Sequence, residues 1–154
     1  MKIDVLTLFP EMFKGPFDES IVKRARDAGL IEINIYDIRA WTDDKRRTVD
    51  DKPFGGGPGM VMKPEPLFKA LDDLENKGKP DKVILLCPRG RKFDQDITLE
   101  LSGLDHLILI CGHYEGIDER VRKYLWSFPF SGMPLCLFIA SWTSLSGQPS
   151  LKVL

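Results

Sequence analysis

The segment GHYEGID, residues 112–118, places His113, Tyr114 and Glu115 between two glycines. A carboxylate such as that of Glu115, held in a narrow turn, can accept a proton or a hydrogen bond from an amine. A histidine exchanges protons near neutral pH, so His113 is a second candidate acid or base. For both residues a structural role, as a solvated turn acid or a hydrogen-bonded histidine, remains the alternative interpretation.

The segment KPFGGGPGMVMKP, residues 52–64, has almost no side chains over several positions. Its small residues are Gly55, Gly56, Gly57, Pro58 and Gly59. Without Cβ atoms the backbone can approach a ligand closely, although a turn or cap is the alternative for any single glycine. The glycine spacing matches neither GxGxxG nor GxxxxGK[ST], so neither nucleotide fingerprint is present.

Cations gather in the segment KRRTVDDK, residues 45–52, just before the glycines. Arg46 and Arg47 are suited to contact phosphate groups, which supply much of the affinity for nucleic acids. The acids of the same region nearly cancel this charge, and the net charge of the whole chain is -1. A solvated surface loop is therefore the alternative for this segment.

The elements that must position these residues follow from hydrophobic periodicity. Apolar runs predict strands, and apolar stripes at helical spacing predict helices. The strands are expected at 2–9, 31–38, 82–88 and 106–112, and the helices at 16–30, 64–79, 94–104 and 116–125, with a polar loop at 39–59. Apolar strands alternating with helices indicate an α/β fold with a mostly parallel sheet and helices on both faces. In such sheets ligands bind beyond the carboxyl ends of the strands, where the loops bearing Gly90 and Glu115 begin.

Length and composition further limit the kinds of protein that this chain can be. A chain of 154 residues forms one domain, or one domain with a fragment. Three cysteines without a CxxC pair suggest buried thiols in a reducing cytoplasm, and no histidine has a metal-ligand spacing. No signal peptide and no membrane-spanning segment are expected.

Four motifs in order then resemble one family. LTLFPEMF, RTVDDKPFGGGPGMVMKPEPL, PRGRKFDQ and CGHYEGIDERV are similar to the bacterial tRNA (guanine-N1)-methyltransferases, the TrmD family of the SPOUT class, over residues 1–125. The resemblance implies a trefoil-knot domain that binds S-adenosylmethionine, a homodimer with the site at its interface, and methylation of N1 of the guanine 3′ to the tRNA anticodon. Magnesium is implicated in the activity of the family.

The resemblance also assigns roles to residues. It implies a cofactor and guanine pocket lined by Pro88, Gly90, Gly112, Tyr114, Glu115 and Gly116. Gly55 to Gly59 match the glycine loop that lies against the guanosine and the partner subunit. Glu115 is the expected catalytic residue, as a general base or an orienting group for guanine.

The chain changes character after Leu125. Residues 126–154 carry a single charge, Lys152, and lack the motif that completes the knot in the family. We expect this tail to be out-of-frame or truncated, the knot to be incomplete, the C-terminal tRNA-binding domain to be absent and the chain alone to be inactive. Two other classes stay open: another α/β enzyme that uses a nucleotide, and a nucleotide- or tRNA-binding α/β module without catalysis.

Overall fold

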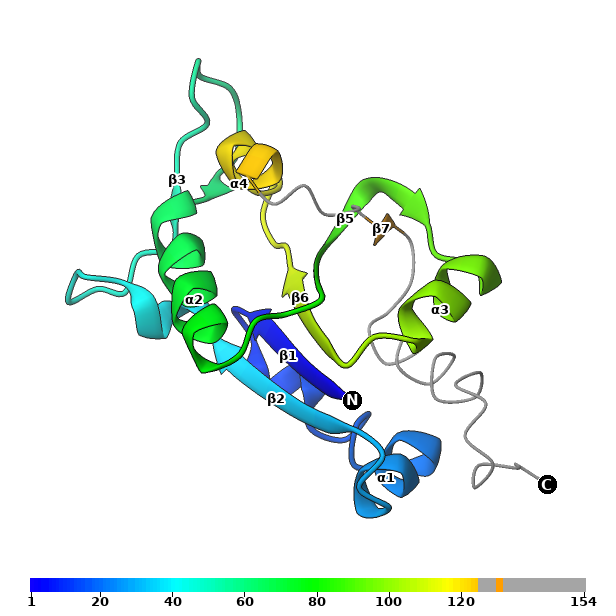
Figure 1. Ribbon diagram of the computed structural model, residues 1–154. Coiled ribbons are helices and arrows are strands. Elements are labelled where there is room, and N and C mark those ends of the chain that lie inside the picture. Colours follow the sequence, from blue (N-terminus) through cyan, green and yellow to red (C-terminus); the bar gives the residue numbers. More distant parts are fainter. Residues whose placement is uncertain (125–129, 132–154) are drawn as a thin grey trace.

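A parallel β-sheet forms the centre of the protein. The computed structural model describes residues 1–124 and 130–131, without the side chains of 87–92, 122, 124, 130 and 131. The strands of this sheet are β1 (Lys2–Thr7), β2 (Glu32–Asp37), β5 (Lys82–Lys92), β6 (His106–Cys111) and β7 (Phe130–Ser131). Their order is β2-β1-β6-β5-β7, and every pairing is parallel. The predicted mostly parallel sheet is confirmed (Figure 1).

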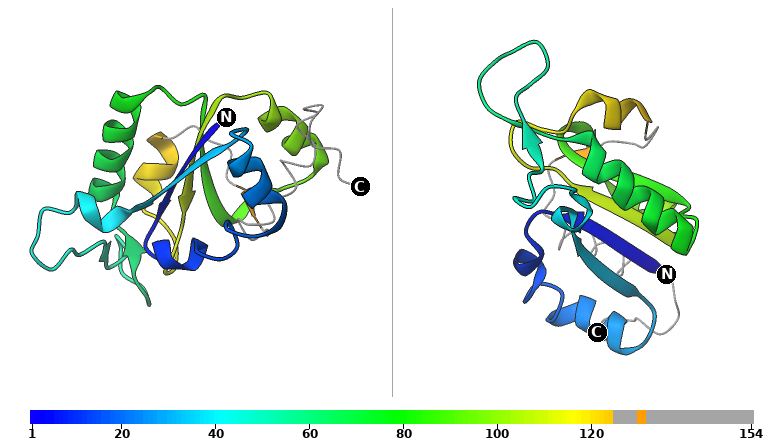
Figure 2. Two further views of the ribbon diagram at one scale, coloured as in Figure 1. Left: turned by 90° about the horizontal axis from the view of Figure 1, so that it is seen from below. Right: turned by 90° about the vertical axis from the view of Figure 1, so that its left-hand side faces the viewer.

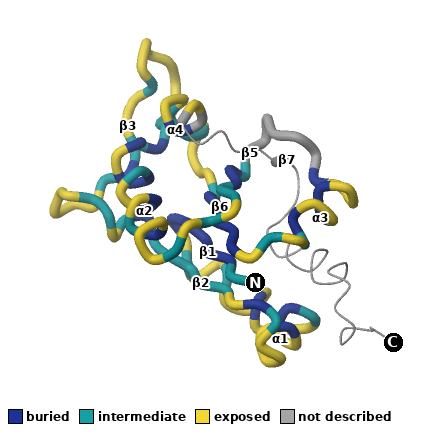
Figure 3. Tube along the Cα trace, in the orientation of Figure 1, coloured by how far each residue is buried: buried dark blue, intermediate teal, exposed yellow. Residues whose placement is uncertain are grey.

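The central strands are buried on both faces, as their apolar runs predict. Val5 of β1 pairs with Leu109 of β6, which pairs in turn with Ile84 of β5, and all three are fully buried. Strands covered on both sides need no polar face, and this is why HLILIC reads as a continuous apolar run. The tube in Figure 3 shows this buried centre against exposed loops.

Helices cover both faces of the sheet. The helices are α1 (Ser20–Asp27), α2 (Pro64–Lys77), α3 (Gln95–Ser102) and α4 (Glu119–Tyr124), with 3₁₀ turns η1 (Pro10–Phe13) and η2 (Ile38–Trp41). The buried residues of α1 and α3 share one apolar core with the sheet, and those of α2 and α4 share a second core with it. Two separate cores on one sheet mean that the helix pairs lie on opposite faces, as predicted (Figure 2).

Local signals explain most helix ends. Pro64 occupies the first turn of α2, where its missing N–H costs nothing, and Gly78 follows the last residue. The Asp94 carboxylate caps α3 by accepting the N–H of Ile97 at 3.1 Å. Helix α1 is shorter than the predicted 16–30, because residues 15–18 form a turn in which the Asp18 N–H donates to the Gly15 carbonyl.

Two loop predictions need correction. The expected loop 39–59 contains η2 and β3 (Asp50–Asp51), which pairs antiparallel with β4 (Val61–Met62). Strand β5 continues to Lys92 instead of ending near Cys87, with a register shift between Leu86 and Arg91 opposite Phe130. Strands of two residues carry no hydrophobic period, so sequence periodicity cannot reveal β3 or β4.

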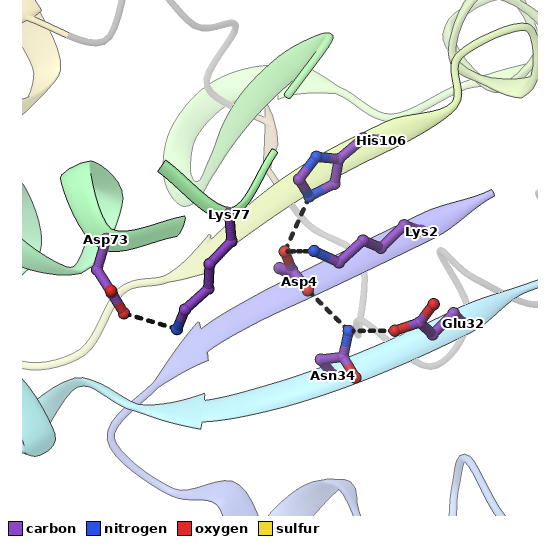
Figure 4. A network of polar contacts seen from close by, with 7 residues as sticks. All are labelled: Lys2, Asp4, Glu32, Asn34, Asp73, Lys77 and His106. Atoms are coloured by element: carbon purple, nitrogen blue, oxygen red, sulfur yellow. Dashed lines mark hydrogen bonds and ion pairs between the residues drawn. The ribbon is translucent and has the colours of Figure 1, made fainter. Parts of the chain in front are cut away.

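A buried polar network crosses the sheet near its amino end. The fully buried Asp4 carboxylate is 2.8 Å from Nε2 of His106 and 3.1 Å from the Lys2 ammonium, and accepts from the Asn34 amide at 3.0 Å (Figure 4). Its oxygens are thereby satisfied, as buried carboxylates require. This network lies at the opposite end of the strands from the candidate site.

The tail prediction concerns residues that lie almost wholly outside the described ones. Of residues 126–154 only the backbone of β7 is described. The predicted incompleteness of the knot also falls outside the described residues. Among the helices that the structure describes, none has the length and apolarity needed to cross a membrane.

Candidate active site

The site lies where the loop after β6 begins beside β5. Leu86 of β5 and Cys111 at the end of β6 are register partners, so this loop starts next to the part of β5 that continues to Lys92. We call residues 112–118 the acid loop and residues 53–60 the glycine loop. In open α/β sheets the carboxyl edge of the strands is the usual place for a ligand.

The acid loop is hydrogen-bonded to strand β4, which follows the glycine loop. The Glu115 N–H donates to the Met60 carbonyl at 3.1 Å, and the Met62 N–H donates to the Gly116 carbonyl at 3.0 Å. The Asp118 N–H donates to the Met62 carbonyl at 3.2 Å, and Met62 forms a parallel bridge with Ile117. Two motifs that are far apart in the sequence are therefore joined by a short ladder of backbone hydrogen bonds.

Gly59 and Glu115 make the closest approach between the two loops. A Cβ at Gly59 would lie 2.3 Å from Cγ of Glu115 and 3.2 Å from its Oε1. The Glu115 side chain thus occupies the space that any other residue at position 59 would need. Glu115 is exposed, and no described group donates a hydrogen bond to its carboxylate. This carboxylate is free to accept a proton or a hydrogen bond from a ligand.

The other glycines of the loop face open space. Gly55, Gly56 and Gly57 have φ of +92°, +81° and +132°, and nothing lies within 4 Å of an added Cβ at any of them. Phe54 beside them is fully exposed. The loop therefore presents bare backbone and one aromatic ring to solvent. Figure 3 colours most of this loop as exposed.

The acid loop bends sharply around its predicted residues. A Cβ at Gly112 would lie 3.3 Å from the Leu86 carbonyl oxygen, so the missing side chain lets this loop pass close to β5. Tyr114 adopts a left-handed φ of +59°, which is uncommon for a tyrosine and turns the chain toward β4. Gly116, at φ +138°, lies in a region that side-chain-bearing residues rarely adopt.

A row of aromatic rings borders the acid loop. The Phe9 ring meets His113 edge-on with centroids 4.8 Å apart, and His113 meets Tyr114 at 4.7 Å. The Arg39 guanidinium lies 5.7 Å from the centre of the Phe9 ring and also donates to the Leu8 carbonyl. Phe9 and Arg39 are site residues that sequence reasoning missed; the only signal for Phe9 was its place in LTLFPEMF.

Two titratable groups lie at the ends of the acid loop: Asp118 is its last residue, and Cys111 directly precedes it. A hydrogen bond from Arg120 lowers the pKa of Asp118, which keeps this carboxylate ionised at neutral pH. Burial raises the pKa of the Cys111 thiol to about 12, so this thiol is not a nucleophile at neutral pH.

Not all predicted site residues come together. Arg46 and Arg47 lie in a separate exposed loop after η2, and no described hydrogen bond joins them to either site loop. Beside that loop and the start of α2 is a cavity of about 440 Å³, whose lining residues include Trp41, Thr48 and Lys63 but none of the acid loop. Pro88 and Gly90 lie on β5 by backbone position, with their surroundings outside the described residues.

No metal site is evident among the described side chains. They contain no group of three histidine, cysteine, aspartate or glutamate residues placed to hold one ion. The described residues thus do not form a ready magnesium site.

The parallel α/β fold, taken with its match to a solved tRNA methyltransferase structure, places the protein in the SPOUT methyltransferase class. The tRNA (Guanine-1)-methyltransferase TrmD family model matches residues 1–131, so the chain belongs to this family. The resemblance predicted from the four motifs is confirmed.

Individual proteins similar to this chain carry the name of the same family. A tRNA (guanine-N(1)-)-methyltransferase of Dictyoglomus turgidum is 60% identical over 125 residues, which are 81% of this chain and 50% of that protein. One from Desulforudis audaxviator is 58% identical over 124 residues, 80% of this chain and 50% of that protein. The crystal structure of the tRNA (m1G37) methyltransferase from Aquifex aeolicus matches with a TM-score of 0.80 at 37% identity, covering all of this chain and 72% of that one. The chain spans about half the length of these two curated relatives.

Proposed function

We propose that this site takes part in transferring a methyl group from S-adenosylmethionine to N1 of the guanine that is 3′-adjacent to the tRNA anticodon. The observation that carries the proposal is the Glu115 carboxylate, unpartnered among the described groups and held across Gly59 of the glycine loop. Family membership supports the reaction class. Residues 1–125 would supply the SPOUT-type cofactor-binding part, consistent with relatives that match over 125 and 124 residues.

The chemistry at guanine requires a proton acceptor. N1 of guanine carries a hydrogen, and it becomes a good nucleophile only when that proton leaves. The Glu115 carboxylate would accept the N1 hydrogen and hold the base in the plane of attack. Because no described group competes for this carboxylate, its lone pairs remain available to the base.

The cofactor would lie against the end of β5 and the loop after β6. S-adenosylmethionine, when bound, supplies a methyl group made electrophilic by its sulfonium. The residues that would hold it are Pro88 and Gly90, which lie on β5 beyond Leu86, and Gly112, Tyr114 and Gly116, which follow Cys111, the register partner of Leu86. The tight turn at Tyr114 and Gly116 exposes backbone groups of this loop at the carboxyl edge of the sheet.

The tRNA and a second subunit would use the outward surfaces. Arg46 and Arg47 would contact phosphates, and the open backbone of Gly55 to Gly57 with Pro58 would meet the guanosine and a partner copy. We also propose a homodimer and a cytoplasmic location, as in the family resemblance.

Binding and transfer assays test the proposal together. The purified chain is titrated with S-adenosylmethionine and, separately, with ATP and NAD by calorimetry, then incubated with labelled S-adenosylmethionine and a tRNA transcript. Among these ligands we expect only S-adenosylmethionine to bind, and to bind weakly, because the knot is expected to be incomplete. Label at guanine N1 would demonstrate catalysis and overturn the expectation that this chain alone is inactive, whereas cofactor binding without label would indicate a binding module. Binding of ATP or NAD without S-adenosylmethionine would contradict the proposal.

A further inference from the structure

The relation between Gly59 and Glu115 assigns a specific task to one glycine of the loop. We infer that Gly59 is a positioning residue: its missing side chain keeps open the one rotamer of Glu115 that lays the carboxylate across the glycine loop. The consequence for methyl transfer rests on the function proposed above, but the positioning itself does not.

The distances from an added Cβ distinguish Gly59 from the other glycines of the loop. An added Cβ at position 59 would be 2.3 Å from Cγ of Glu115, 3.1 Å from Cδ and 3.2 Å from Oε1, and real Cβ atoms essentially never approach another heavy atom as closely as the first. At Gly55, Gly56 and Gly57 the same Cβ would meet nothing within 4 Å. These three need glycine only for their backbone conformation, whereas Gly59 also needs it for the Glu115 side chain.

The backbone on both sides of the contact is held in place. Glu115 donates its N–H to the Met60 carbonyl at 3.1 Å, next to Gly59, and Gly116 accepts from Met62 at 3.0 Å. The two Cα atoms therefore cannot easily separate to admit a new methyl group. The Glu115 side chain, which is exposed, is the part that is free to move.

An alanine at position 59 is consequently expected to displace the carboxylate rather than unfold the protein. Glu115 would rotate about χ1 into another staggered well, because only χ1 moves Cγ, off-rotamer angles are costly and solvent offers space. The carboxylate would then leave its place over the glycine loop while the fold persisted.

The test measures the Glu115 rotamer directly. In isotopically labelled chain, three-bond couplings between Hα and Hβ report χ1 of Glu115 in the original protein and in Gly59→Ala. The matched control is Gly29→Ala, since Gly29 also has a positive φ, +69°, and open space around it, but lies at the end of α1. We expect changed Glu115 couplings in Gly59→Ala and unchanged ones in Gly29→Ala. Unchanged couplings in both variants would overturn the inference.

A double variant and an RNA affinity measurement test the positioning role further. If Gly59→Ala does not fold, recovery of folding in Gly59→Ala/Glu115→Ala supports the inference, because alanine at 115 has no Cγ; failure to recover overturns it. Affinity for an anticodon stem-loop RNA with guanine after the anticodon is measured alongside. Changed couplings with unchanged RNA affinity would uphold the positioning role and count against Glu115 as the guanine contact, so the two proposals fail separately.

Discussion

The thioether sulfur of Met62 accepts the backbone N–H of His113 at 3.3 Å. Met62 is fully buried, and its own N–H and C=O bond to Gly116 and Asp118 of the same loop. One residue of a two-residue strand therefore engages the acid loop at three points. Sulfur is a weak acceptor, so the contact at His113 is the one most open to change.

Replacing Met62 by leucine tests this contact. The swap keeps nearly the same apolar volume and is expected to cost less than about 1.5 kcal/mol of unfolding free energy. The His113 amide loses its acceptor, so its hydrogen exchange should accelerate about two- to fivefold relative to the original protein, as expected for a lost weak bond of about 0.5–1 kcal/mol. Amide exchange followed by NMR measures this, with the exposed Met12→Leu as control. An unchanged rate at His113 would show that the sulfur contact contributes nothing.

The buried Asp4 carboxylate should dominate the polar contribution to stability. Asp4→Ala leaves His106, Lys2 and Asn34 without their shared acceptor, and breaking such a buried pair typically costs about 3 kcal/mol or more. Asp27→Ala removes an exposed pair with Lys23 and should change stability by less than about 0.5 kcal/mol. Urea unfolding of both variants provides the comparison. Equal losses of unfolding free energy in the two variants would mean that the Asp4 network in Figure 4 contributes no more to stability than an exposed ion pair.

Cys111 should resist alkylation while the protein is folded. Burial raises the pKa of its thiol to about 12, so at pH 8 the thiolate is on the order of 10⁻⁴ of the population. The folded state favours the neutral thiol. Relative to the unfolded chain, the thiolate fraction of the folded protein is therefore reduced most strongly below the unfolded pKa of about 9, and this difference is lost as the pH rises toward the folded pKa of about 12. Iodoacetamide labelling, read peptide by peptide with mass spectrometry, should be slow at pH 8 and fast in denaturant. Rapid labelling of folded protein at pH 8 would contradict the raised pKa of this partly buried thiol.

Arg46 and Arg47 should contribute to tRNA affinity through charge alone. Each Arg→Gln substitution is expected to weaken binding and to reduce the slope of log affinity against log salt by about one, as for a phosphate contact. Lys79→Gln is the control, because Lys79 is an exposed cation just before the amino end of β5. Fluorescence anisotropy at several salt concentrations measures the slopes. Equal slopes of log affinity against log salt for all three variants would mean that neither arginine contacts the tRNA.

The sequence predicts those parts of the fold that depend on local pattern. HLILIC reads as a buried strand because burial on both faces leaves a continuous apolar run, and α2 begins at Pro64 because proline suits the first turn of a helix. The helix ends at Lys77, before Gly78, and so two residues short of the predicted end at 79. The hairpin of β3 and β4 is not predictable in this way. Its strands are DD and VM, and their pairing depends on contacts with the distant acid loop.

The same distinction applies to the candidate site. Glu115 and the glycines stand out by residue type, so sequence reasoning finds them separately. Their contact at Gly59 depends on how β4 aligns with the acid loop, which no spacing reveals. Phe9 was missed because an aromatic ring at the end of a strand looks like an ordinary core residue until His113 is placed against it.

The most direct test of the central claim is an NMR titration of the chain with anticodon stem-loop RNA. Two RNAs are compared that differ only at the position 3′ to the anticodon, guanine in one and adenine in the other. The account predicts amide shifts at Gly55, Gly56, Gly57 and Gly59 and at His113 to Gly116 with the guanine RNA, and much smaller ones there with the adenine RNA. Equal responses to the two RNAs, or shifts confined to other segments, would contradict a guanine site between the glycine loop and the acid loop.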